Sequence, residues 1–454
     1  MTNPTSATPS TPADPMELVR SRSYLVVLLF GAVIGAPVAF VAYFFLKWIS
    51  VVQHYGFTTL PGELGFHGEP IWWPVVPLAV CGLLVGLTIQ HLPGTAGHKP
   101  AEGFKASGAP APIDLPGIAI AAFATLSLGA VLGPEAPLIA IGSGLGVLAM
   151  HLVKKDAPAQ AVAVIGAAGS FAAISTLLGS PLVGAFLLME AAGLGGPLLG
   201  VILVPGLLAA GIGALIFVGL DNWTGYGTFS LAISNIPPFK EVVGGELLWA
   251  VGIGVAAALL GVCIRWMALF LQPIIEKRKA LLTTLAGLAI AGFAIAFAEA
   301  SGKSSSDVLF SGQSFLPSLI QNAAGWTVGA LVLLVLFKSL AFGASLGGFR
   351  GGPTFPGMFI GAAGGMALSH LPGLPLIAGV AMGIGGMTVA MLGLPLTSVL
   401  LTSLFLEVDA VKLMPLVIIA VVVSYVVTAR LAPVLPKITP ESALTPAAPS
   451  TQGN

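Results

Sequence analysis

The residues best suited to bind an anion occur in two similar short motifs. Residues 133–142 read GPEAPLIAIG and residues 352–361 read GPTFPGMFIG, so both contain Gly-Pro-x-x-Pro-x-x-x-Ile-Gly. Proline is favoured in the first turn of a helix, where its missing N–H costs nothing. The other N–H groups of that turn lack helical partners, and the helix dipole adds about half a positive charge there. Two such N-termini facing one cavity would bind an anion without Lys or Arg.

Glu135, in the first turn of the first motif, is the main candidate for a chemical role. An ionisable side chain at membrane depth is costly and indicates function. An ionised Glu135 could occupy the anion site and block it, whereas a protonated or displaced Glu135 would leave it open. We therefore predict a gate, with a plain helix cap as the alternative. Glu190 is either a structural hydrogen-bonding group or an inner proton relay, and Glu299 and Glu407 are weaker candidates.

The helices that carry these motifs must lie in a membrane. Of 454 residues, 56% are hydrophobic and only 8% are charged, against about 25% charged in soluble proteins. This excludes a soluble enzyme, a nucleic-acid binder and a disordered chain. Apolar runs of about twenty residues indicate membrane helices and not a β-barrel. The 59 glycines and 35 prolines predict broken helices, which membranes accept only where protein or a water-filled cavity surrounds them.

The two motifs belong to an internal repeat. A second matched pair, LGSPL at 178–182 and LGLPL at 392–396, follows in the same order, and the two pairs are offset by 219 and 214 residues. Interrupted segments at matching places in two halves point to a binding site between the halves. We predict a first membrane repeat at 24–220 and a second at 221–434, between disordered tails at 1–23 and 435–454. The repeat alone fits an inverted or a parallel arrangement.

Basic residues predict the orientation of the chain. Arg20 and Arg22 precede the first apolar span, and the loop at 52–70 has neither Lys nor Arg. Lys154-Lys155 and Lys277-Arg278-Lys279 are the other basic clusters. The positive-inside rule therefore places the N-terminus and both clusters in the cytoplasm. We expect a multi-pass protein of the plasma or inner membrane.

At these motifs the chain resembles the CLC family of chloride channels and chloride/proton exchangers. Residues 133–137 are similar to the family's glycine-acid-glycine-proline motif, and residues 352–356 are similar to its Gly-x-Phe-x-Pro motif. The stretches 167–190 and 394–415 resemble those that close the two halves. The resemblance covers about residues 24–434. It implies an all-α polytopic membrane protein with a CLC-like inverted repeat of many tilted and broken helices. It also implies a homodimer with one pore per subunit, and Glu135 as the gating and proton-accepting residue.

The family's first filter motif, Gly-Ser-Gly-x-Pro, has two possible counterparts. Residues 106–110 match its letters better, but residues 96–100 fit its spacing to Glu135, and we prefer them. Gly97 then replaces the chloride-contacting serine. His98 beside it would be a new donor at the pore, or else a loop histidine. The predicted anion-binding residues are Gly97, His98, Lys99, Gly133, Glu135, Ala136, Gly352, Thr354 and Phe355.

Other departures bear on the transport mode. Thr354 stands where the family has phenylalanine, and Pro353 removes one N–H that could face the anion. Ala191 stands where the exchangers have their inner proton-carrying glutamate, and no tyrosine follows Tyr425 to serve as the family's pore tyrosine. We therefore favour passive conduction of chloride or another small anion, gated by Glu135. The alternatives are a chloride/proton antiporter and a scaffold with a dead pore. We expect no enzyme activity, cofactor or metal.

Overall fold

The computed structural model describes residues 19–104, 108–193, 198–225, 244–406 and 410–436. Within them the chain forms helices and loops, and its β-structure is limited to one isolated bridge. In the part of the chain that the structure describes, eight helices are long and apolar enough to cross a membrane. The all-α polytopic fold predicted from the sequence is confirmed. Residues 1–18 and 437–454, most of the two predicted tails, lie outside the described residues.

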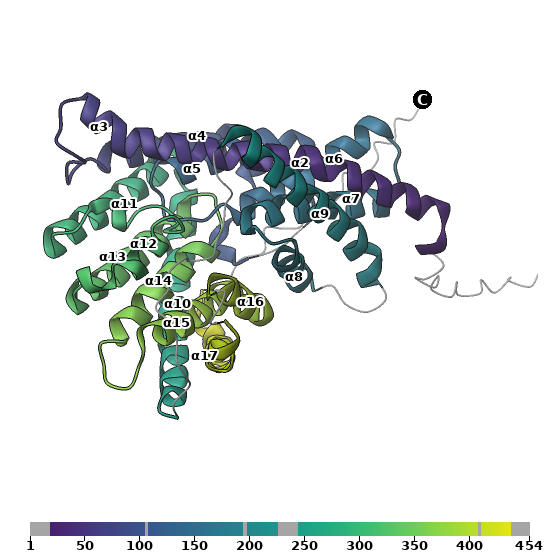
Figure 1. The fold of residues 1–454 in the computed structure, drawn as a ribbon. Helices are drawn as coiled ribbons and strands as arrows, with labels where there is room; N and C mark the ends of the chain where they lie inside the picture. Colours follow the sequence, from purple (N-terminus) through teal and green to yellow (C-terminus); the bar gives the residue numbers. More distant parts are fainter. Residues whose placement is uncertain (1–18, 105–107, 194–197, 226–243, 407–409, 437–454) are drawn as a thin grey trace, which may run out of the picture.

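The first half runs from α2 to α9 (Figure 1). The helix α2 has an interior proline and continues into a π-helical turn at Tyr55–Thr59, followed by a short α3. The helices of this half are α2 (Arg22–His54), α3 (Leu60–Glu63), α4 (Val75–His91), α5 (Leu115–Ser127), α6 (Glu135–Val153), α7 (Ala159–Leu178), α8 (Pro181–Ala191) and α9 (Leu198–Thr224).

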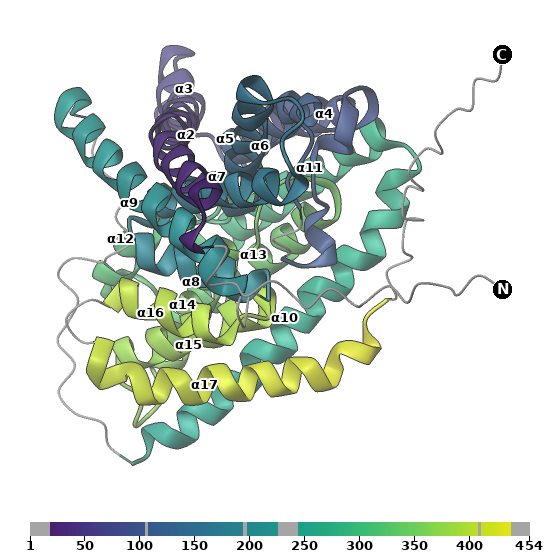
Figure 2. The ribbon, with the colours of Figure 1, turned by 90° about the vertical axis from the view of Figure 1, so that its right-hand side faces the viewer.

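The second half runs from α10 to α17, and Figure 1 shows its green and yellow helices beside the purple and teal helices of the first. The last helix, α17, packs on α10 and α15 (Figure 2). The helices of this half are α10 (Glu246–Glu276), α11 (Lys279–Ser301), α12 (Leu316–Gln321), α13 (Val328–Gly348), α14 (Thr354–Leu368), α15 (Leu376–Leu392), α16 (Pro395–Leu406) and α17 (Ala410–Leu431).

Glycines at matching positions hold the same helix pair together in each half. A Cβ added to Gly142 in α6 would lie 2.5 Å from the carbonyl oxygen of Gly169 in α7. A Cβ on Gly361 in α14 would collide with the carbonyl oxygen of Gly383 in α15. Small residues let membrane helices approach this closely, where apolar burial alone gives little attraction. The close pairs α6–α7 and α14–α15 therefore anchor the start of each repeated helix.

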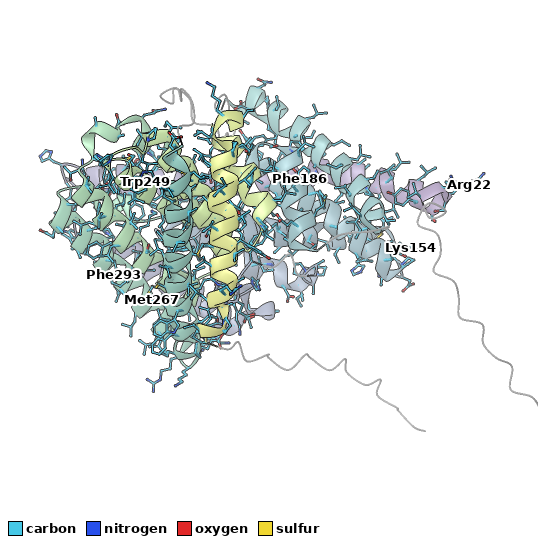
Figure 3. All side chains as sticks on the ribbon, turned by 90° about the horizontal axis from the view of Figure 1, so that it is seen from below. Arg22, Lys154, Phe186, Trp249, Met267 and Phe293 are labelled. Carbon is cyan, nitrogen blue, oxygen red and sulfur yellow. The ribbon has the colours of Figure 1, made fainter. Side chains whose placement is uncertain are left out.

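Apolar side chains cover the outer surface of the long helices. Leu25, Val33, Leu215 and Leu248 are each more than half exposed, as expected for side chains that face lipid. Figure 3 shows Arg22 and Lys154 near one end of the molecule, away from Trp249. Two of the basic segments used in the orientation argument thus lie near the same end.

Candidate functional site

The two repeated motifs meet at a pair of glycines. The N–H of Gly133 donates to the carbonyl of Gly352 at 2.8 Å, and the N–H of Gly352 donates to the carbonyl of Gly133 at 2.7 Å. The pairing is antiparallel, and α6 and α14 each begin two residues after their glycine. The two helix N-termini therefore lie together at the centre of the molecule, in the antiparallel relation that an inverted repeat requires.

The Glu135 carboxylate lies between these helix ends. Glu135 is fully buried, and its Oε1 accepts the backbone N–H of Thr354 at 2.5 Å. Thr354 is the first residue of α14, so the carboxylate of the first motif occupies the N-terminus of the second helix. A helix N-terminus is a ready anion site. The side chain of Glu135 therefore occupies a helix end that has the donors of an anion site.

Two polar atoms beside this contact are buried without a hydrogen-bond partner, namely Oε2 of Glu135 and the hydroxyl of Thr354. Phe355, the next residue of α14, is buried beside them. Buried polar atoms are nearly always satisfied in native proteins, and exceptions often mark functional sites. The pair marks this position as a candidate functional site.

The bridging glycines make room for the Glu135 side chain. A Cβ on Gly133 would collide with the Glu135 carboxylate, and so would a Cβ on Gly352. Neither glycine has a positive φ, so space and not backbone conformation requires glycine here. The sequence predicted both as site residues, and the structure gives each a steric role at Glu135.

A cavity reaches each of the two chain neighbours of Glu135. One, of about 340 Å³, is lined by Pro134, and the other, of about 230 Å³, is lined by Ala136. We name them the outer and the inner cavity, after the sides that the orientation predicted from the sequence would give them. The polar side chains lining the outer cavity are Ser50, Gln53, Ser311, Gln313 and Ser314.

Those neutral polar side chains were not predicted from the sequence. They come from α2 and from the loop before α12, two segments far apart in the chain. Serine and glutamine are common in loops and helix ends, so no local motif marks them. They offer hydroxyl and amide donors to an anion without adding charge.

The inner cavity brings the preferred first filter segment to α6. Gly97 and His98 line it together with Ala136. The His98 ring places Nε2 at 2.7 Å from the carbonyl of Gly103. The competing segment also reaches this cavity through residues 108–110, while residues 106 and 107 lie outside the described residues. The inner cavity therefore contains parts of both segments, and our preference for 96–100 stays a prediction.

Lys99 points away from Glu135. Its ammonium forms an ion pair with Glu276 of α10 at 2.9 Å, and the side chain lines a third cavity. Lys99 is one of the residues predicted to bind the anion, but its side chain belongs to this separate group of charged residues. A direct contact between its ammonium and a pore anion receives no support from this position.

Glu190 holds the N-terminus of α16. Its Oε1 accepts the N–H of Leu396 at 2.9 Å, and its Oε2 accepts the N–H and the hydroxyl of Thr397 at 2.7 and 2.6 Å. A carboxylate at a helix N-terminus is stabilised by these donors and by the dipole. Leu188 and Ala192, on either side, line the inner cavity. Glu190 therefore acts structurally in this conformation, and its proposed relay role remains a prediction.

Comparison with known proteins places the chain in a family. A family model described as voltage gated chloride channel matches residues 81–429, well over half of the sequence. The chain belongs to this CLC family. Among curated proteins, it is 30% identical over 364 residues to the YfeO ion-transport protein of Escherichia coli O6:H1, covering 78% of this chain and 82% of the relative. The YfeO protein of Escherichia coli K12 (strain DH10B) is 29% identical over the same length and coverage.

Solved structures of the family have the same fold. A slow cyanobacterial Cl⁻/H⁺ antiporter matches 89% of this chain and 94% of its own, with a TM-score of 0.70 and 18% identity. A CLC-type fluoride/proton antiporter matches 90% of this chain and 97% of its own, with a TM-score of 0.68 and 17% identity. The predicted CLC-like fold and the family membership are confirmed. Among the described residues, no group of three or more His, Cys, Asp or Glu could hold a metal.

Proposed function

We propose that this CLC protein carries chloride or another small anion across the membrane along a path that Glu135 gates. The carrying observation is the Glu135 carboxylate, which occupies the N-terminus of α14, while its chain neighbours Pro134 and Ala136 line the outer and the inner cavity. In this conformation the path is closed by the protein's own anion. Protonation would remove the charge that the helix end attracts, and the side chain would leave the site to the transported ion.

Passive conduction is the favoured mode. An exchanger must pass protons from the cytoplasm to Glu135, and the inner cavity is lined mainly by alanine and aliphatic side chains. Ala191 carries no proton, and Glu190 is held by three donors at α16. Chloride/proton exchange is the second candidate, because His98, a residue able to carry a proton near neutral pH, lines the inner cavity.

The remaining features of the proposal follow the resemblance and the charge pattern. We propose a homodimer with one path per subunit, in the plasma or inner membrane, with the N-terminus in the cytoplasm. The inner cavity then opens toward the cytoplasm, since it includes residues at the N-terminal ends of α7 and α9 near Tyr24 of α2.

Purified protein in chloride-loaded vesicles tests the gate. Chloride efflux from wild-type vesicles should rise as external pH falls, because protonation releases Glu135. The isosteric Glu135→Gln variant should conduct at every pH, since its amide carries no charge. Unchanged pH dependence in this variant would remove Glu135 as the gate. Uphill proton movement driven by a chloride gradient would show chloride/proton exchange in place of passive conduction. The absence of any anion flux would support the scaffold with a dead pore.

A further inference from the structure

A third cavity, of about 200 Å³, lies apart from the two cavities beside Glu135. It is bounded by the loop before the first filter segment, the end of α10 and the beginning of α11. Lys99, Lys279 and Arg350 line it, together with Glu276 as the single acidic side chain. Three cations against one carboxylate leave the lining with a net charge of two positive, and Glu102, hydrogen-bonded to the lining residue Gln272, reduces the excess to one. In a protein with so few charged residues, this cavity is unusually cationic.

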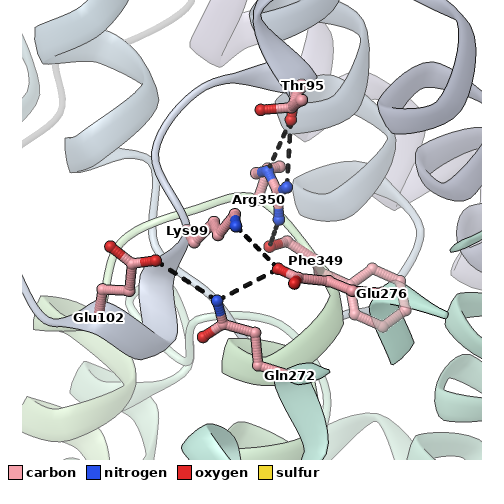
Figure 4. Close-up of polar contacts among 7 residues, drawn as sticks. All are labelled: Thr95, Lys99, Glu102, Gln272, Glu276, Phe349 and Arg350. Atoms are coloured by element: carbon pink, nitrogen blue, oxygen red, sulfur yellow. Dashed lines mark hydrogen bonds and ion pairs between the residues drawn. The ribbon is translucent and has the colours of Figure 1, made fainter. Parts of the chain in front are cut away.

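Arg350 gives the cavity a buried and partly unused set of donors. The residue is 7% exposed, and its Nε and one Nη both donate to the carbonyl of Thr95, at 3.3 and 3.1 Å (Figure 4). The other Nη donates to the carbonyl of Phe349 at 3.1 Å. A guanidinium has five N–H groups, so two remain after these three contacts. An arginine fork of this kind suits two oxygens of one oxyanion.

Thr283 is an independent sign of a ligand. Thr283 is one of the residues that line the cavity; its side chain is fully buried, and its hydroxyl has no hydrogen-bond partner. A buried hydroxyl without a partner costs free energy and is rare in native proteins. Thr283 lies at the start of α11, a 23-residue helix that begins at Lys279. Its free N–H groups and dipole add positive potential at the same end.

We propose that this cavity binds a phosphate-type oxyanion from the cytoplasmic side. The excess positive charge of the lining attracts inorganic phosphate. Its four oxygens can accept from the Arg350 guanidinium, the Lys279 ammonium and the Thr283 hydroxyl together. Chloride is a single acceptor centre, so it does not offer two acceptor atoms to the paired N–H groups of a guanidinium.

Arg350 also connects this cavity to both filter segments. It stands two residues before Gly352, and Thr95, whose carbonyl it holds, stands two residues before Gly97. Thr95 and Ala96 have φ of 49° and 60°, a region that non-glycine residues rarely adopt. A bound oxyanion that draws on Arg350 would change the restraint on this strained turn. Control of the anion path by the ligand rests on the proposed function, whereas binding does not.

Thermal unfolding of the full-length protein in detergent tests the site with inorganic phosphate as the probe. A ligand that binds the folded state raises the unfolding temperature. Phosphate should raise it for wild type more than chloride does at equal ionic strength. Thr283→Val keeps the shape and removes the hydroxyl, and Lys279→Ala removes a lining charge. Each should weaken the apparent affinity for phosphate about tenfold, a loss of 1.4 kcal/mol. Lys277→Ala, in the same basic cluster but outside the cavity lining, is the matched control.

If phosphate raises the unfolding temperature of wild type and the three variants equally, or no more than chloride does, either result would contradict the proposed site. The measurement is repeated in phosphatidylcholine vesicles with and without phosphatidylglycerol. Stabilisation by phosphatidylglycerol that the two cavity variants lose supports the site with a lipid phosphate as its occupant. The binding test needs no ion flux. A protein that binds phosphate but carries no anion would therefore contradict the proposed function and leave this site standing.

Discussion

At the scale of single residues, the site depends on how one carboxylate is accommodated. Glu135 reaches across from α6 to the first N–H of α14, and it can do so because Gly133 and Gly352 have no side chains. The carboxylate, the N–H that donates to it and the space between them come from two motifs 219 residues apart. The proposed gate is thus a contact between repeats, and we expect substitutions that crowd it to act on gating and not on selectivity.

Gly352→Ala tests this steric fit. The added methyl group would collide with the Glu135 carboxylate and should displace it from the N-terminus of α14. We expect chloride efflux at neutral pH to rise several-fold, because the closed position is lost. Gly364→Ala, in the same helix with open space around its Cα, should leave efflux at the wild-type level. Equal efflux from both variants would mean that the carboxylate does not close the path.

A second titratable residue, Asp307, should make the stability of the protein depend on pH. Burial raises the pKa of Asp307 from 3.8 to about 6, against the attraction of Lys338. Between about pH 4 and pH 6 the folded protein therefore binds more protons at Asp307 than the unfolded chain does. Stability should fall as pH rises through this window. Above it, the ionised form costs up to about 3 kcal/mol at 1.36 kcal/mol per pKa unit.

Asp307→Asn should remove this dependence. We expect a higher unfolding temperature than wild type at pH 7 and a flatter profile between pH 4 and pH 6. Both follow from unfolding curves in detergent across that range. A profile as steep as that of wild type would assign the pH dependence to another group, of which Glu69 is the first to examine. Burial also raises the pKa of Glu69, and its carboxylate accepts the hydroxyl hydrogen of Ser306 at 2.5 Å.

At the scale of elements, short helices in the membrane are fixed by their ends. The 12-residue α16 cannot cross the membrane alone, and its N-terminus is satisfied by Glu190 of α8 through three hydrogen bonds. The helix α8 is its counterpart in the first repeat. The two short helices are thus joined by a charged cap, which aligns the repeats at a distance from the gate.

Glu190→Gln separates a cap from a proton relay. The amide keeps the shape but loses the charge, so the N-terminus of α16 should be destabilised by about 1–3 kcal/mol, seen as a lower unfolding temperature. Thr397→Val, which removes one of the three donors, should show a smaller loss. Chloride flux per folded molecule and its pH dependence should match wild type in both. A selective loss of proton-linked flux in Glu190→Gln would instead establish the relay.

At the scale of the whole molecule, the sequence predicted the features that local pattern encodes. Composition indicated a membrane protein, and the Gly-Pro motifs located both helix N-termini, because proline and glycine mark helix starts within a few residues. The partner of Glu190 lies 206 residues away, and Thr95 lies 255 residues from Arg350. Such contacts depend on how the two halves dock, which no short stretch of sequence specifies.

The homodimer is a further prediction at this scale. It follows from the resemblance to the family, and the exposed apolar surface of the long helices leaves room for both lipid and a second subunit. Light scattering of the purified protein, corrected for detergent, should give twice the chain mass of 45.8 kDa. A value of one chain mass under mild detergent conditions would contradict the prediction.

The antiparallel glycine bridge has a consequence for how the protein is made. Gly133 and Gly352 each supply one strand of the bridge, so the first repeat emerging from the ribosome contains only one of the two helix ends. Only after residues beyond 352 have been inserted can the two helix ends meet. Under the proposed function, a partly synthesised chain therefore lacks a complete anion path. We expect permeability only after the two halves dock, when Glu135 is in place to close the path.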